Sequence, residues 1–178
     1  MQPLILTAAF DETSRAVFHD LRNRHFPPSL NRVPAHLTLF HHLPGSELPS
    51  ILDRLTTEAS HLAPIPFVTA GVRFLGRGCA FDIAAPALLQ LRAALAADWR
   101  GWLNPQDRQG FRPHVTVQNK VAPDAAQALA EDLATLPPMK GRIVGLDLWH
   151  YEGGPWRLEQ HRPFAATSPS AEESAEPA

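Results

Sequence analysis

Hydrophobic positions along the chain follow two spacings, and the order of these spacings repeats. Short apolar runs typical of strands occupy residues 4–10 and 79–83. Each run is followed by a segment with hydrophobic residues at helical spacing, residues 13–25 in one case and 87–99 in the other. The pattern therefore predicts that each half of the chain begins with a strand and a helix.

Each half then continues with three further elements. A short tetrad of alternating polar and apolar residues predicts a second strand, and amphipathic stretches follow it at residues 48–62 and 126–136. β-rich runs at residues 67–74 and 141–149 close the two halves. The order strand, helix, strand, helix, strand occurs twice, which predicts an α+β fold. We expect a bilobal, duplicated unit with pseudo-two-fold symmetry, in which antiparallel sheets flanked by helices surround a central cleft.

The domain boundaries follow from composition. Residues 1–164 contain no polar linker, so we expect one compact domain whose lobes exchange elements around the cleft. Residues 165–178 contain no aromatic or β-branched aliphatic residue and are rich in Ser, Pro, Glu and Ala. Because such a segment buries too little apolar surface to offset the entropy of ordering, we expect a disordered tail.

Composition limits the class of protein. Of 178 residues, 44% are hydrophobic, and 16 basic side chains face 18 acidic ones, giving a net charge of -2. These values argue against disorder over most of the chain and against binding of long nucleic acid through bulk positive charge, but they allow a small anionic substrate. The single cysteine, Cys79, excludes an internal disulfide framework and a cysteine-rich zinc site. With no basic leader and no long apolar run, we expect a cytoplasmic protein without a membrane partner, and a monomer.

The two tetrads carry the candidate chemistry. His-Leu-Thr-Leu occupies residues 36–39, and His-Val-Thr-Val occupies residues 114–117. Because side chains alternate along a strand, the His and Thr of each tetrad share one face while the apolar pair points into the lobe. If an approximate two-fold axis relates the lobes, both polar faces line one cleft. Two imidazoles and two hydroxyls would then lie together.

Such a set suits phosphoryl transfer. Imidazole titrates near neutral pH, so one ring can accept a proton from the nucleophile while the other delivers a proton to the leaving oxygen. Each threonine hydroxyl can donate a hydrogen bond to a non-bridging phosphoryl oxygen, where charge develops. We therefore predict chemistry that needs no metal and no cofactor.

Polar residues near the second tetrad are further candidates. Arg112 and Lys120 flank it and can pair with phosphate, although a solvated cation is an equally good interpretation of each. The alternation that begins at His114 also predicts that Gln118 and Lys120 share the polar face. Gln118 would then contact a base or a sugar.

The paired tetrads, one in each half of a short α+β chain, resemble the two-histidine (2H) phosphoesterase superfamily, which includes 2'-5' RNA ligases and 2',3'-cyclic phosphodiesterases. The resemblance spans residues 1–164. It implies that His36 and His114 are the catalytic pair and that Thr38 and Thr116 bind phosphate. The residues after the first tetrad, Phe-His-His, differ from the Phe-Leu-Gly expected in the RNA-ligase branch, so the chain resembles a divergent member.

The resemblance implies a metal-independent phosphodiesterase that acts in RNA processing. Its partner would be a nucleotide or RNA end with a phosphate ester, either a 2',3'-cyclic phosphate or a 2'-5' linkage. Hydrolysis is the expected direction, and ligation is its reverse at the same site. The alternative is a non-catalytic module that binds a nucleotide or phosphate ligand.

Other motifs have more than one interpretation. His41 and His42 suggest a metal carrier together with His36, but no Asp, Glu or Cys accompanies them at close spacing. Trp149 and Trp156 can stack a base, although packing at the edge of a lobe is the favoured interpretation.

Overall fold

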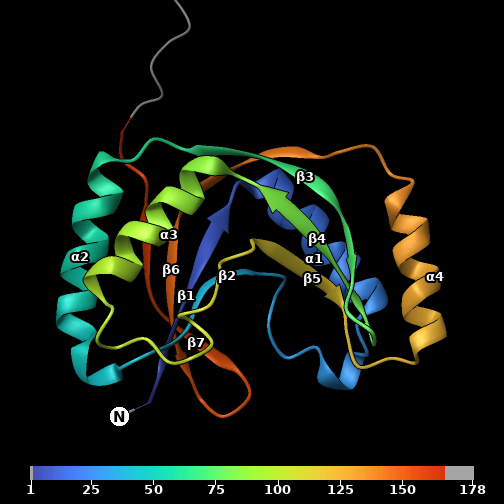
Figure 1. Ribbon diagram of the computed structural model, residues 1–178, viewed down its shortest axis with the longest axis horizontal. Coiled ribbons are helices and arrows are strands. Elements are labelled where there is room, and N and C mark those ends of the chain that lie inside the picture. Colours follow the sequence, from blue (N-terminus) through green and yellow to red (C-terminus); the bar gives the residue numbers. More distant parts are fainter. Residues whose placement is uncertain (1, 167–178) are drawn as a thin grey trace, which may run out of the picture.

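The computed structural model describes residues 2–166 and contains four α-helices and seven strands among them (Figure 1). The strands are β1 (Leu4–Phe10), β2 (Leu37–Leu43), β3 (Ile65–Phe74), β4 (Cys79–Ala84), β5 (His114–Gln118), β6 (Lys140–Tyr151) and β7 (Trp156–Pro163). The helices are α1 (Glu12–His25), α2 (Leu48–His61), α3 (Pro86–Asp98) and α4 (Pro123–Ala134). Each predicted helix and strand up to β6 is present within a few residues of its expected bounds.

Local sequence explains where the helices begin. The side chain of Asp11 caps α1 by accepting a hydrogen bond from the backbone N–H of Ser14, at 2.8 Å. α3 and α4 each carry proline at the first position, where the missing N–H costs nothing. The turn between β3 and β4 forms a hairpin, in which Gly76 adopts a φ of +82°, a value that glycine tolerates.

All strand pairs are antiparallel, and the pairing order is β2-β1-β6-β3-β4-β5, with β7 added at β6. The first strand of each half, β1 or β4, pairs with the second strand of its own half and with the third strand of the other half. The lobes therefore exchange their third strands. The prediction of an antiparallel α+β fold is confirmed, and the pairing of β3 with β6 joins the sheets of the two lobes into one.

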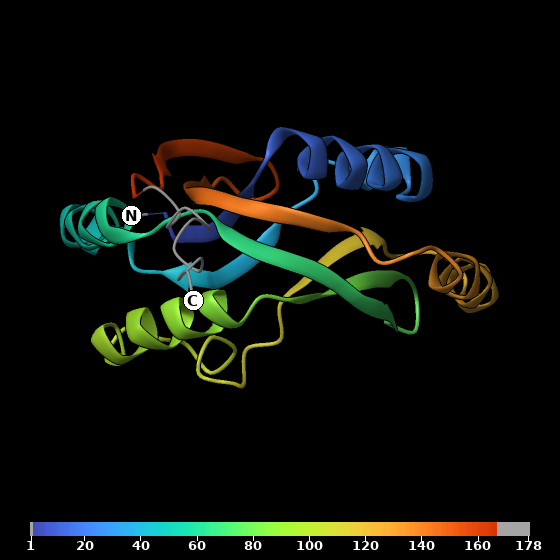
Figure 2. The ribbon, with the colours of Figure 1, turned by 90° about the horizontal axis from the view of Figure 1, so that it is seen from above.

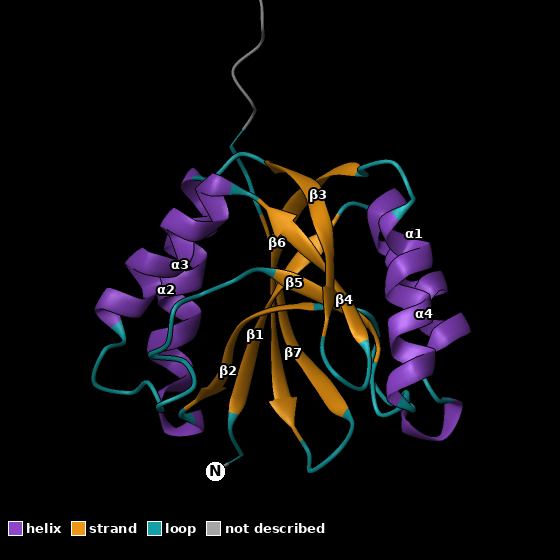
Figure 3. Ribbon diagram, turned by 45° about the vertical axis from the view of Figure 1, so that its right-hand side comes forward, coloured by secondary structure: helices purple, strands orange, loops and turns teal. Residues whose placement is uncertain are grey.

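Helices from both halves share each flank of the sheet. Figure 3 shows α2 and α3 on one side of the strands and α1 and α4 on the other, and Figure 2 shows the same grouping from above. β2 and β5, the two ends of the pairing order, contact each other although no ladder joins them. This contact brings the two tetrad strands together.

One strand was missed by the sequence analysis. β7 consists mostly of polar residues and lies at the edge of the sheet, so it carries no clear hydrophobic alternation. It nevertheless pairs with β6 over most of its length and forms an outer strand of the sheet.

The start of the predicted tail is ordered by α2 and the loop after it. The backbone N–H groups of Ala165 and Ala166 donate to the carbonyls of Ala59 and Leu62. The rest of the predicted tail lies outside the described residues. Within residues 2–166, no helix combines the length and the hydrophobicity that crossing a bilayer requires.

Candidate active site at the paired tetrads

The two tetrads adopt matching positions at the start of their strands. His114 is the first residue of β5, and His36 directly precedes β2. The apolar partners are fully buried, whereas Thr38 and Thr116 remain partly exposed. The predicted division into an apolar face and a polar face is therefore correct for both tetrads.

Each histidine is held through the same ring nitrogen. Nδ1 of His36 lies 2.7 Å from the carbonyl oxygen of Pro34, and Nδ1 of His114 lies 2.9 Å from that of Arg112. A carbonyl only accepts, so Nδ1 carries the proton in both rings, and in the neutral state Nε2 holds the free lone pair. The two imidazoles are thus oriented alike, with Nε2 available for proton transfer.

A buried arginine from α1 joins the surroundings of the two histidines. The guanidinium of Arg22 donates from Nε to the carbonyl of Val33 and to the side chain of Asn31, and from Nη1 to the carbonyl of Thr116, at 2.9 Å. One side chain therefore connects the loop before His36 with the strand that begins at His114. Burial lowers the pKa of Arg22 to about 10, so it stays charged at neutral pH.

The electrostatic environment makes His36 a neutral imidazole. Burial, the largest cause, lowers the pKa of His36 to about 4, and the hydrogen bond to Pro34 only partly opposes this effect. Arg22, His41 and His114 each add a smaller electrostatic lowering. A positive charge on His114 therefore acts on His36, which couples the two rings. At pH 7 His36 is therefore neutral, and the lone pair of its Nε2 is free to accept a proton.

Thr38 belongs to a polar row that crosses four strands. Strand pairing aligns Thr38 on β2 with Thr7 on β1, Thr7 with Asp147 on β6, and Asp147 with His161 on β7. Directly opposite residues of neighbouring strands point to the same face, so these side chains share the face that His36 occupies.

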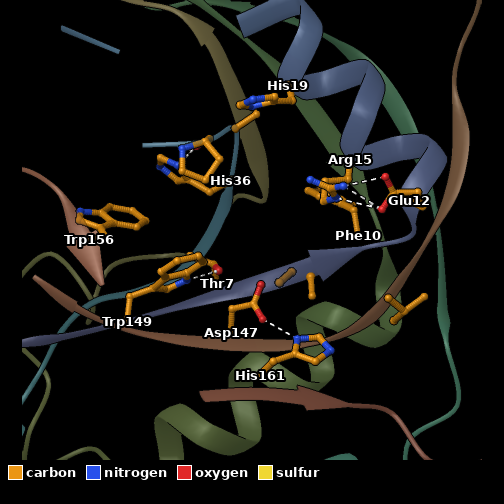
Figure 4. Close-up of a pocket in the computed structure, with 15 residues that line it drawn as sticks. Thr7, Phe10, Glu12, Arg15, His19, His36, Asp147, Trp149, Trp156 and His161 are labelled. Atoms are coloured by element: carbon orange, nitrogen blue, oxygen red, sulfur yellow. Dashed lines mark hydrogen bonds and ion pairs between the residues drawn. The ribbon is translucent and has the colours of Figure 1, made fainter. Parts of the chain in front are cut away.

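A cavity of about 440 Å³ opens on this face beside His36 (Figure 4). Its other walls come from β1, β6, β7 and the first turns of α1. The lining side chains labelled in Figure 4 are Thr7, Phe10, Glu12, Arg15, His19, His36, Asp147, Trp149, Trp156 and His161. Of the His and Thr side chains of the two tetrads, only His36 lines this cavity.

The predicted alternation beyond Thr116 is wrong. A register shift between Cys79 and Ala80 inserts an extra residue in β5, so Val117 and Gln118 are both buried. Gln118 is only 7% exposed and does not share the face of His114. Lys120 lies beyond the end of β5 with a φ of +62°, so no strand carries it to that face.

Arg112, the other cation that flanks the second tetrad, contacts the site with its backbone carbonyl. Arg112 is exposed, and its carbonyl, rather than its guanidinium, has a defined partner in His114. The prediction that Arg112 pairs with phosphate remains a prediction.

His41 and His42 have a structural role. The buried carboxylate of Asp107 accepts hydrogen bonds from the backbone N–H groups of both residues, at 2.9 to 3.1 Å, and lies 3.0 Å from Nδ1 of His41. Burial alone would raise the pKa of Asp107, but these hydrogen bonds outweigh it and hold the pKa below its ordinary value. The carboxylate thereby provides hydrogen-bond acceptors for backbone N–H groups of the edge strand β2. Within residues 2–166, no three His, Cys, Asp or Glu side chains are grouped suitably for a metal ion.

Apart from His36, Trp149 and Trp156, the sequence analysis did not identify the cavity residues. Thr7 and Asp147 are polar residues within otherwise apolar stretches of β1 and β6. A polar residue in such a strand was the available sign that this position faces a site and not the core. His161 carried no such signal, because its strand was not recognised.

Comparison with known proteins agrees with this architecture. The family model described as "2'-5' RNA ligase superfamily" matches residues 10–155. No curated protein gave a match. The similar solved structures include TT0787 of Thermus thermophilus, which is 21% identical with a TM-score of 0.67 and covers 92% of this chain and 98% of its own.

LigT of E. coli has also been crystallised in forms that resemble this chain. The complex with NADP+ is 20% identical with a TM-score of 0.58, and it covers 93% of this chain and 99% of its own. The complex with 3'-AMP is 21% identical with a TM-score of 0.55, over the same shares of the two chains. At these identities the likeness shows a common fold.

Proposed function

Because this chain belongs to the 2'-5' RNA ligase superfamily, we propose that it is a metal-independent phosphodiesterase acting on nucleotide or RNA ends. Membership supports phosphoesterase activity in general. The more specific proposal is that the substrate carries a 2',3'-cyclic phosphate or a 2'-5' linkage, and that His36 and His114 exchange protons with it. Ligands in the neighbouring LigT structures, 3'-AMP and NADP+, support a nucleotide as the substrate class.

The observation that carries the proposal is the matched anchoring of the two imidazoles. Both rings donate from Nδ1 to the carbonyl two residues earlier, which leaves both Nε2 atoms for proton transfer. Two such rings on contacting strands suit in-line displacement at phosphorus, in which the nucleophile and the leaving oxygen each exchange a proton.

The lowered pKa of His36 supports the role of proton acceptor for this histidine in hydrolysis. Neutral His36 accepts a proton from water as the water oxygen forms its bond to phosphorus. The bond from phosphorus to the ribose oxygen breaks, and protonated His114 delivers its proton to that oxygen. Thr38 and Thr116 donate hydrogen bonds to the non-bridging oxygens. Proton exchange with solvent then restores neutral His36 and protonated His114.

The test is turnover of 2',3'-cyclic nucleotides, followed by ³¹P NMR with and without EDTA. We expect hydrolysis that survives EDTA and falls by about 10²- to 10⁴-fold in His36→Ala and in His114→Ala, the usual contribution of a general acid or base. His42→Ala is the matched control, because His42 is an exposed histidine of β2 whose side chain lies outside the proposed machinery. It should retain full activity.

Two outcomes would contradict the proposal. Nucleotide binding without turnover by the wild-type protein would instead support the non-catalytic binding module. Turnover that EDTA abolishes, or that survives both histidine substitutions, would rule out the two-histidine mechanism. Thermal melting of each variant, compared with the wild-type protein, separates loss of catalysis from loss of folding.

A further inference from the structure

The cavity beside His36 has an aromatic wall. Trp156 lies with its ring centroid 4.5 Å from that of His36, and the Trp149 ring lies 6.2 Å from the Trp156 ring. Both tryptophans line the cavity and remain partly exposed rather than packed into the core. Figure 4 shows the two indoles and His36 on the same side of the cavity.

Most polar side chains of the cavity are already paired with one another; His19, whose buried Nδ1 has no hydrogen-bond partner, is an exception. Arg15 binds Glu12, and Nδ1 of His161 lies 2.6 Å from the carboxylate of Asp147. The indole N–H of Trp149 donates to the hydroxyl of Thr7 at 2.9 Å, which fixes the plane of that ring. The cavity therefore offers a ligand the faces of its aromatic rings, together with Nε2 of His36 and the unpaired Nδ1 of His19.

The position of the indoles relative to His36 suits a nucleoside. In a nucleotide the base and the phosphate are attached to the same ribose, so a phosphate held at Nε2 of His36 places the base about one sugar ring away. The cavity is lined by His36 as well as by both tryptophans, so a phosphate at His36 and a base on the indoles would be neighbours. Its volume of about 440 Å³ lies within the range of small-molecule sites.

We propose that this cavity is a nucleobase-stacking subsite, in which Trp156 and Trp149 receive the base of the nucleoside that carries the reactive phosphate. The position of the phosphate rests on the proposed function. Stacking uses the aromatic face that all bases share, and most of the neighbouring polar groups are paired. The subsite accordingly prefers a nucleoside to a bare sugar phosphate and discriminates weakly among bases.

The experiment compares two substrates of the full-length protein. One is a 2',3'-cyclic nucleotide, and the other is 1-O-methylribose 2',3'-cyclic phosphate, which has the same reactive ring and no base. The quantity measured is the ratio of kcat/KM for the two. We expect the wild-type protein to favour the nucleotide and Trp156→Ala to lower this ratio about tenfold, the effect of losing one stacked base. Trp156→Phe, which keeps an aromatic face, should restore most of the ratio.

Trp102→Phe is the matched control, because Trp102 is a partly exposed tryptophan that stacks on Trp99 and does not line the cavity. It should leave the ratio unchanged. An unchanged ratio in Trp156→Ala would overturn the subsite, and so would an equal loss for both substrates, because Trp156 would then act on His36 alone.

A binding measurement keeps failure of the subsite distinct from failure of the proposed function. If the wild-type protein turns over neither substrate, the proposed function fails, and titration with 3'-AMP still tests the subsite. Quenching of tryptophan fluorescence by 3'-AMP, but not by inorganic phosphate, that is lost in Trp156→Phe would support stacking on Trp156. Quenching that persists unchanged in this variant would overturn it.

Discussion

At the scale of single residues, the candidate site depends on how the chain approaches each histidine. The carbonyl two residues before the ring accepts from Nδ1 in both halves. The two preceding residues nevertheless differ, Pro34 and Ala35 in one half and Arg112 and Pro113 in the other. The backbone, and not a particular side chain, therefore selects the tautomer. A substitution at the residue before either histidine should be tolerated as long as the loop keeps its path.

The lowered pKa of His36 predicts a pH dependence of stability. The unfolded chain binds a proton at His36 near pH 6.5, whereas the folded chain does so only near pH 4. Between these values the unfolded state holds more protons, so the free energy of unfolding decreases as the pH falls, by at most about 1.4 kcal/mol per pH unit from this group. Urea unfolding at pH 7, 6, 5 and 4 measures the slope.

His36→Gln removes the titrating group and serves as the comparison. We expect the wild-type protein to lose more stability than the variant between pH 6.5 and 4, and the two proteins to show parallel behaviour above pH 7. Parallel curves over the whole range would mean that the folded protein does not keep His36 neutral.

At the scale of elements, two buried arginines connect each half to the tetrad strand of the other. Arg22 on α1 donates to the carbonyl of Thr116 on β5, and Arg92 on α3 donates to the carbonyl of Leu39 on β2 at 2.7 Å. Each guanidinium also lies over a phenylalanine ring, Phe26 for Arg22 and Phe40 for Arg92. The helix of one half thus stabilises the strand that carries the other half's chemistry.

Removing one of these connections should cost stability. Arg22→Met leaves several carbonyl oxygens near the site without their donor, and we expect a loss of about 1–3 kcal/mol in the free energy of unfolding. Arg24→Met on the same helix removes an exposed ion pair with Asp20 and should change stability by less than about 1 kcal/mol. Equal effects of the two substitutions would contradict a bridging role for Arg22.

Sequence patterns predicted the elements that have one strong signal. β1 is a continuous apolar run, and Leu88, Leu91 and Leu95 of α3 form a single buried stripe. β7 was missed because its sequence is mostly polar, and its strand conformation depends on pairing with β6. The extra residue in β5 was equally hidden, since a bulge depends on the register with β4.

The same reasoning explains what was found and missed in the site. His36, Thr38, His114 and Thr116 were identified because each pair is local in sequence and the pairs repeat. The cavity is assembled from β1, α1, β6 and β7, so its residues are close only after the sheet has formed. Packing was the favoured interpretation of Trp149 and Trp156, because the sequence does not show whether an indole stays partly exposed in the folded protein.

At the scale of the whole molecule, the exchange of third strands makes the two lobes one folding unit. β6 pairs with β3 through residues 140–143 and with β1 through residues 143–150, so it belongs to both lobes. The buried hydrophobic residues likewise form one continuous cluster. β3 finds both of its partner strands in the second half, and β6 has only β7 as a partner within its own half.

Unfolding should therefore occur in a single step. We expect one calorimetric transition for the full chain, with equal calorimetric and van't Hoff enthalpies, and no cooperative transition for residues 1–78 or 79–166 expressed alone. A cooperative melt of either half would mean that a lobe is stable without the exchanged strand.

The late position of β6 also has a consequence for synthesis in the cell. While the ribosome is still producing residues before 140, the edge of β1 that β6 will cover stays open, and so does the edge of β3. Nascent chains are thus exposed to strand pairing with one another for most of translation. Slow elongation over the segment from 123 to 140 would prolong this vulnerable interval, and premature termination there would favour aggregates over a truncated but folded product.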